Sequence, residues 1–179
     1  MEVVFDNKTN VLNAKLHATH DNSVIYTIST DETVFSRAYT YVKDANPAQG
    51  GETTIVGVIN WSKKTFEING HRKAIYDIRR KPGGFRNKSR YWKWAEDREE
   101  YNVVHQEDGW ENFQANCTST VEVEASFSVP YRPVLWGKVK PLVLKLSRVA
   151  LAKDEVFLIL VFIYSEIKRQ EKMNSAGGW

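Results

Sequence analysis

Alternation of apolar and polar residues dominates the first four-fifths of the chain. Residues 12–18 place Leu or Ala at every second position, with Asn, Lys and His between them, and residues 121–127 alternate Val, Ala and Phe with Glu and Ser. A period of two is typical of a half-buried strand, because successive side chains point to opposite faces. We therefore predict two strands with the following residues turned toward the core: Leu12, Ala14, Leu16, Ala18, Val121, Val123, Ala125 and Phe127.

Runs of β-branched and aromatic residues indicate further strands between these two. They cover residues 24–28, 34–42, 53–61, 65–68 and 74–78. Asn69-Gly70 separates the last two runs, and this dipeptide is the strongest short-range hairpin signal. Asp108-Gly109 is a second candidate turn. Short strands with a turn every ~8–12 residues favour an antiparallel sandwich or barrel.

The C-terminal part of the chain has a different pattern. Residues 156–164 are nine consecutive apolar residues, preceded by two acids and followed within eight residues by Lys168, Arg169 and Lys172. Acids first and bases last complement the helix macrodipole. No Gly or Pro interrupts residues 154–173, which would span about 30 Å as a helix. We predict a helix over 154–173, buried on every side in its first half.

This helix is not predicted to cross a membrane. A membrane span needs roughly 20 mostly apolar residues, and charged residues bound the apolar run at Glu155 and Glu166. Residues 1–6 carry neither the basic start nor the apolar core of a signal peptide. We therefore expect a cytoplasmic protein that is not transmembrane.

The length of 179 residues indicates one domain, since domains average ~150 residues. We predict a single domain over 1–174. Residues 175–179, Ser-Ala-Gly-Gly-Trp, have the composition of a flexible tail.

Three segments together resemble a known fold. They are the strand Ile55-Val56-Gly57-Val58-Ile59-Asn60 ending at Trp61, the aromatic strand Arg90-Tyr91-Trp92-Lys93-Trp94, and the helix over 154–170. With them the chain resembles the tubby C-terminal-like fold, a superfamily of tubby proteins, phospholipid scramblases and plant LURP-one-related proteins. It is most similar to a family of fungal proteins of uncharacterised function placed with that fold.

The resemblance implies a mainly β domain with one long helix. Its expected architecture is a closed antiparallel β-barrel of about twelve strands, threaded by the hydrophobic C-terminal helix. A barrel of that width has an interior too wide for its own side chains to fill. The helix would fill this space and satisfy its own backbone hydrogen bonds.

Charge is separated along the chain. The formal net charge is only +3. Residues 61–93 nevertheless carry +9, and residues 95–125 carry −8. Either the acidic segment pairs with the basic one across neighbouring strands, or the basic segment is free to bind an anionic partner.

The densest basic stretch, residues 79–90, is a candidate binding loop because Pro82, Gly83 and Gly84 interrupt it. Arg supplies bidentate donors that match phosphate, and clustered bases attract anionic lipid. We predict a site for an anionic phospholipid of the phosphoinositide type, or another phosphorylated ligand. Its residues are Arg79, Arg80, Lys81, Arg86, Lys88 and Arg90.

Nucleic acid is a less favoured polyanion. Tyr91, Trp92 and Trp94 lie beside two bases, which resembles a base-stacking surface. However, Trp92 and Trp94 have the same parity in a strand, so we expect both to face the interior. The isoelectric point near 8.9 also falls short of the value of about 9 that marks nucleic-acid-binding domains.

Motifs for catalysis are absent from the sequence. No GxGxxG, Walker A, HExxH or GxSxG occurs, and the four histidines are scattered. Cys117, the single cysteine, can form neither an internal disulfide nor a cysteine-based metal centre. We predict a non-enzymatic binding domain without metal or cofactor. Two other binding functions stay open: a protein-interaction scaffold with a dipolar surface, and a lectin-like role with Trp110 or Trp136 as the sugar platform.

Overall fold

The computed structural model describes residues 1–33, 36–46, 53–83, 89–106, 112–129 and 141–176. These residues form thirteen strands and three helices in the order β1 (Glu2–Phe5), β2 (Ala14–Ala18), β3 (Val24–Glu32), β4 (Arg37–Asp44), β5 (Thr54–Asn60), β6 (Thr65–Ile68), β7 (His71–Ala74), α1 (Ile75–Ile78), β8 (Arg79–Arg80), β9 (Arg90–Lys93), β10 (Glu100–Gln106), β11 (Asn112–Cys117), β12 (Val123–Ser128), β13 (Val143–Leu146), α2 (Arg148–Lys153) and α3 (Glu155–Ala176).

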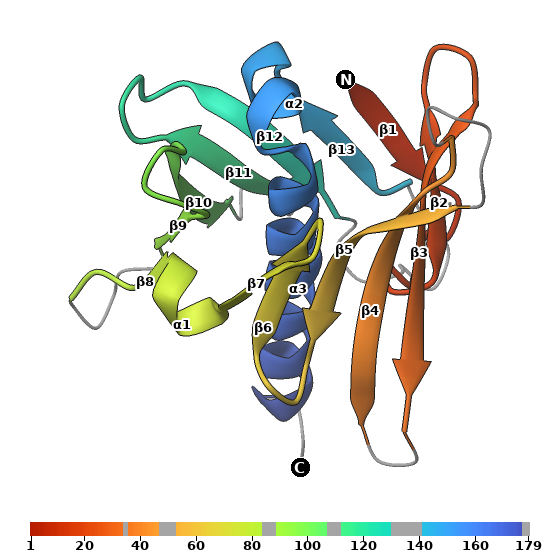
Figure 1. Ribbon diagram of the computed structural model, residues 1–179, viewed down its shortest axis with the longest axis horizontal. Coiled ribbons are helices and arrows are strands. Elements are labelled where there is room, and N and C mark those ends of the chain that lie inside the picture. The colour runs from red at the N-terminus through yellow and green to blue at the C-terminus, as the bar shows by residue number, and fades with distance from the viewer. Residues whose placement is uncertain (34–35, 47–52, 84–88, 107–111, 130–140, 177–179) are drawn as a thin grey trace.

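The described strands form one antiparallel sheet with the order β7-β6-β5-β4-β3-β2-β1-β13-β12-β11-β10-β9-β8. β1 and β13 pair in the middle of this order, so the first strand of the chain joins the two halves of the sheet. The halves lie on opposite sides of α3, with β3–β5 on one side and β9–β11 on the other (Figure 1). The protein is therefore mainly β, with a sheet that curves around a C-terminal helix.

Helix α3 confirms the predicted helix and its burial. It begins at Glu155, and every side chain from Phe157 to Tyr164 is buried. It extends to Ala176, so the predicted flexible tail is wrong at Ser175 and Ala176, which lie in the last turn of the helix. Residues 177–179 fall outside the described part of the chain. In the parts of the chain that the structure describes, no helix is both long and apolar enough to span a membrane.

The prediction of Asn69-Gly70 as a hairpin turn is also confirmed. β6 and β7 pair from Ile68–His71 outward, which leaves only these two residues in the loop. Both have positive φ, 48° at Asn69 and 81° at Gly70, as a type I′ turn requires. The second candidate turn, Asp108-Gly109, lies outside the described residues.

The predicted strand at 74–78 is wrong beyond its first residue. Ala74 ends β7, and residues Ile75–Ile78 form the single helical turn α1. Residues three apart on a helix share a face, so this turn buries both Ile75 and Ile78. A strand would have turned one of them outward.

The predicted inward positions are correct from Leu12 to Ala18 but wrong at Val121 and Val123. These two valines are 80% and 51% exposed. The register between β11 and β12 shifts by one residue, so that Ala115 faces Ala125 whereas Asn116 faces Val123. The extra residue, Glu124, turns inward and accepts a hydrogen bond from the Ser147 hydroxyl. Such a β-bulge reverses the faces of all residues beyond it.

The hydrogen-bonded ladder of described strands does not close between β7 and β8, a gap that we call the seam. Side-chain contacts span it instead. The Lys73 ammonium donates to the Trp94 carbonyl at 2.6 Å, and the Phe66 and Trp92 rings stack at 5.8 Å between centroids. The predicted closure of the barrel by strand pairing is therefore not seen at this position.

Candidate functional site

Strand register divides the predicted basic site between two faces of the sheet. In β8, Arg79 lies opposite Trp92 and Arg80 opposite Tyr91. Trp92 is buried and in turn lies opposite the buried Tyr101, so this row faces the interior. Arg80 and Tyr91 therefore belong to the outer face, because neighbouring residues of a strand alternate.

Arg80 pairs with the acidic segment. Its guanidinium donates two hydrogen bonds to the Glu100 carboxylate, at 2.8 Å and 2.7 Å, and lies 4.0 Å from the centroid of the Tyr91 ring. The hydrogen bond from Arg80 lowers the pKa of Glu100 below its usual range. The basic and acidic segments therefore pair with each other at this position, as the first of the two possibilities for the charged segments predicts.

Arg79 packs on aromatic rings. Its guanidinium carbon lies 5.6 Å from the centroid of Trp92 and 5.8 Å from that of Tyr164. No described carboxylate forms an ion pair with it. Cations attract the faces of aromatic rings, which explains how the charge is accommodated here.

The other predicted residues are spread more widely. Lys81 is exposed, just beyond the end of β8. Arg90 is half-buried at the start of β9, where it donates to the carbonyl of Ser89. Arg86 and Lys88 lie outside the described residues, as do both candidate sugar platforms, Trp110 and Trp136. The structure thus separates Arg79 from Arg80. Of the two exposed bases in the described set, Arg80 is paired with Glu100, and Lys81 forms no ion pair with a described residue.

The prediction that Trp92 and Trp94 face inward is confirmed. Trp92 is 1% exposed and stacks on Phe66, while the Trp94 ring lies 5.7 Å from Phe157 of α3. The Trp92 ring is not available for stacking on nucleic-acid bases, and the half-buried Trp94 ring packs against the core with the Lys73 ammonium 5.1 Å from its centroid.

Tyr164 is the centre of a group that sequence reasoning missed. Its ring stacks on Trp61 with centroids 5.6 Å apart and meets Phe66 and Trp92 edge-on. The Lys168 ammonium lies 5.8 Å from the same ring. We call this group, completed by two arginines, the aromatic–cation cluster: Arg37, Trp61, Phe66, Arg79, Trp92, Tyr164 and Lys168.

Polar contacts fix the outer part of the cluster. The Trp61 indole donates to the buried Thr40 hydroxyl at 2.8 Å. The Arg37 guanidinium lies 5.7 Å from the Trp61 ring and 2.7 Å from the Glu171 carboxylate. The spacing of Tyr164 and Lys168, one helical turn apart, is the only signal of this arrangement in the sequence. The strand residues come from β4, β6, β8 and β9, and only the three-dimensional structure shows that they lie together.

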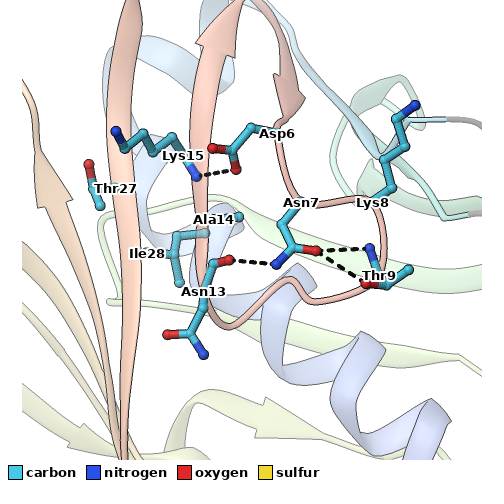
Figure 2. A pocket seen from close by; sticks show the side chains of 9 residues that line it. All are labelled: Asp6, Asn7, Lys8, Thr9, Asn13, Ala14, Lys15, Thr27 and Ile28. Atoms are coloured by element: carbon cyan, nitrogen blue, oxygen red, sulfur yellow. Dashed lines mark hydrogen bonds between the residues drawn. The ribbon is translucent and has the colours of Figure 1, made fainter.

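A shallow groove of about 520 Å³ lies beside the loop between β1 and β2. Figure 2 shows that its polar groups bind one another: Asn7 donates to the Asn13 carbonyl and accepts from Thr9, and Asp6 accepts from the Lys15 amide. The Lys8 and Lys15 side chains point away from each other (Figure 2). The groove therefore does not gather its charges around one ligand.

One buried and one half-buried carboxyl group, those of Asp154 and Glu155, lie at the N-terminal end of α3. Asp154 is 3% exposed, accepts a hydrogen bond of 2.8 Å from the Tyr101 hydroxyl, and has Arg98 at 3.7 Å. Burial raises the pKa of Asp154 above its usual range. Burial also raises the pKa of Glu155, which is hydrogen-bonded to Tyr26.

Cys117 contacts a carboxylate and a hydroxyl. Its sulfur lies 3.4 Å from Glu99 and 3.1 Å from Ser119. A carboxylate neighbour does not activate a thiol, since activation requires a nearby positive charge. Among the described residues, no three His, Cys, Asp or Glu side chains are placed to hold a metal ion.

Comparison with protein-family models, with curated proteins and with solved structures finds no match to this chain. The resemblance to the tubby C-terminal-like fold stays a prediction from the sequence.

Proposed function

We propose that the protein is a non-catalytic, cytoplasmic binding domain that attaches to anionic membrane surfaces as a peripheral protein. In this proposal its fold is of the tubby type, with a barrel that the side chains at the seam complete. The Lys73–Trp94 hydrogen bond and the Phe66–Trp92 stack support that closure, because they join the two ends of the sheet.

The observation that carries the proposed function is the exposure of Tyr76. This side chain is 78% exposed in α1, four residues before Arg80 and five before Lys81, both of them exposed. Tyrosine favours the level of the lipid headgroups, and each base near an anionic membrane contributes ~1 kcal/mol of attraction. We refer to Tyr76, Arg80 and Lys81 as the membrane face; Arg86 and Lys88 are its proposed continuation.

The proposal is tested by co-sedimentation with phosphatidylcholine vesicles, with and without phosphoinositide. Native protein is expected to bind only the anionic vesicles, and more weakly at higher salt because the interaction is electrostatic. The double variant Tyr76→Ser, Lys81→Glu should lose this binding and keep its melting temperature, since both side chains are exposed. Lys8→Glu, the same charge reversal in the β1–β2 loop, is the control and should bind as the native protein does. Native protein that stays in the supernatant at low salt would contradict the proposal.

A protein-interaction module is the second candidate function. Three exposed valines favour it: Val121, Val123 and Val149 are 80%, 51% and 52% exposed. Its simplest partner is a second copy of the chain, which sedimentation velocity over a range of concentrations would detect. Self-association that weakens in Val121→Thr, Val149→Thr would support this function, and a monomer at every concentration would contradict it.

A further inference from the structure

The aromatic–cation cluster contains hydrogen-bond donors without matching acceptors. Arg79 lies over Trp92 and Tyr164, and no described carboxylate pairs with it. Asp77 is only two residues away, in α1, but it does not pair with Arg79 in the described structure. A half-buried guanidinium normally has an acceptor for its five N–H groups.

Positive charge exceeds negative charge in this cluster. Arg37 and Lys168 both bind the single carboxylate of Glu171, each at 2.7 Å. Glu166, the other nearby acid of α3, is already paired with Arg169 at 2.7 Å. Two cations therefore share one carboxylate, and Arg79 adds a third positive charge.

Two polar groups of the aromatic rings also lack partners. The Trp92 indole nitrogen is buried and has no hydrogen-bond partner among the described residues. Tyr164 is 6% exposed, and its hydroxyl makes no hydrogen bond to any residue that the structure describes. The Trp92 nitrogen is fully buried, whereas the Tyr164 hydroxyl is not. A buried polar group without a partner is uncommon in proteins, and bound water or an ion usually explains it.

We infer that the aromatic–cation cluster is a binding site for a compact phosphate-type oxyanion. Arg79 binds two of its oxygens through the edge of the guanidinium, while the guanidinium face stays on the Trp92 and Tyr164 rings. Lys168 supplies a second positive charge, and the Tyr164 hydroxyl donates a further hydrogen bond. This site lies on the inner side of β8 and is separate from the membrane face.

The class of ligand follows from the donor set. The planar fork of an arginine matches two oxygens of a phosphate, and stacking on rings leaves that edge free. A neutral acceptor would fill the hydrogen bonds but would leave the excess charge uncompensated. A phosphate-type anion satisfies both requirements.

The test is a titration of the native protein with inorganic phosphate at constant ionic strength, read by tryptophan fluorescence, because Trp61 and Trp92 belong to the cluster. A saturable change is expected. Arg79→Gln should weaken the binding by about tenfold or more, as loss of a charge-assisted hydrogen bond does. Lys172→Gln is the control. It also removes one positive charge, but from an exposed position one helical turn beyond Lys168, and it should leave the binding unchanged.

Tyr164→Phe keeps the ring and removes only the hydroxyl, so it tests the site even when Arg79→Gln does not fold. It should weaken phosphate binding several-fold, in line with one lost hydrogen bond. A second arm replaces free phosphate with phosphatidylcholine vesicles that contain phosphatidic acid, whose headgroup is the same oxyanion. Saturable binding in either arm that Tyr164→Phe weakens supports the site and identifies the source of the anion.

The inference is overturned when native protein shows no saturable response in either arm, or when Tyr164→Phe behaves as Lys172→Gln does. A different result is expected when this phosphate site exists but the proposed membrane binding does not. In that case native protein would bind free phosphate through Arg79 and Tyr164 but would ignore anionic vesicles.

Discussion

At the scale of single residues, Gly57 sets how closely α3 can approach the sheet. A β-carbon at this position of β5 would lie 2.8 Å from Val156 Cγ1 and 3.3 Å from Leu160 Cδ2. Both contacts belong to buried or half-buried side chains of α3, so these side chains, or the helix that carries them, must shift to admit a methyl group. We expect Gly57→Ala to lower the free energy of unfolding by about 1–3 kcal/mol, as overpacking of a core does. Urea denaturation measures this loss.

Gly83→Ala is the matched control for this prediction. A β-carbon at Gly83 would meet no atom within 4 Å. The variant should change the free energy of unfolding by less than about 0.5 kcal/mol. Equal losses in the two variants would contradict the role of close packing at Gly57.

Asp154 gives the stability a pH dependence of unusual sign. Burial raises its pKa in the folded protein above the value of 3.8 expected in the unfolded chain. The folded state therefore holds the proton to higher pH, and the contribution of Asp154 to stability is full below pH 3.8 and declines as pH rises through the folded pKa. Asp154→Asn, which cannot ionise, should remove this decline. Urea midpoints between about pH 3.5 and 6 measure it.

The Arg80–Glu100 pair provides the comparison of opposite sign. Arg80 lowers the pKa of Glu100, so this pair stabilises the protein above the unfolded pKa of 4.5 and the benefit is lost as pH falls. Glu100→Gln should therefore change the pH profile in the direction opposite to Asp154→Asn. Profiles that shift in the same direction would show that the burial of Asp154 does not control its ionisation.

At the scale of elements, α3 is the part of the core on which the sheet depends. Leu160 is completely buried, so Leu160→Asp would place a carboxylate among apolar side chains. Burying an unpaired charge costs several kcal/mol, against a total stability of about 5–15 kcal/mol. We expect the variant to lose its cooperative thermal transition, measured by circular dichroism. Lys172→Asp, an exposed position of the same helix, should still melt cooperatively, and a cooperatively folded Leu160→Asp variant would refute the role of α3 as core.

Local sequence patterns predicted the elements whose structure depends on near neighbours. The Asn69-Gly70 turn and the long apolar helix are of this kind, and both are confirmed. The sequence could not reveal the bulge opposite Ala115, because one extra residue in a strand leaves no mark in the alternating pattern. It also could not reveal α1, where burial of both Ile75 and Ile78 outweighs the β-branched composition.

The candidate site shows the same limit. The sequence pattern predicts one basic loop over residues 79–90, yet two of these residues form β8 and point to opposite faces. If a strand is assigned to these residues, Arg79 and Arg80 must point to opposite faces of the sheet, because consecutive side chains of a strand alternate. The contact of Arg79 with Tyr164 joins residues 85 positions apart and depends on how the sheet curves around α3.

At the scale of the whole molecule, the sheet is held differently at its middle and at its ends. β1 and β13 pair at the centre of the strand order, which ties the N-terminal strand to the last strand before α2. The ends of the sheet, β7 and β8, meet across the seam through side chains such as Lys73 and Phe66. Since side-chain contacts do not protect backbone amides as a ladder does, the seam is the place where the sheet should open most easily.

Hydrogen exchange of backbone amides tests this weakness directly. Amides of β7 and β8 should exchange faster than those of β1 and β13, because the ladder has no partner strand on their outer side. Lys73→Met keeps the length of the side chain and removes the donor to the Trp94 carbonyl, so exchange in β7 and β9 should accelerate further. Lys145→Met, which removes the 3.1 Å contact with Glu2 between β13 and β1, is the control and should leave these rates unchanged because a full ladder remains there. Amides of β7 and β8 that exchange as slowly as those of the central strands would contradict this prediction. The two ends of the sheet would then be held together by more than the Lys73 and Phe66 contacts, and the sheet would not open at the seam.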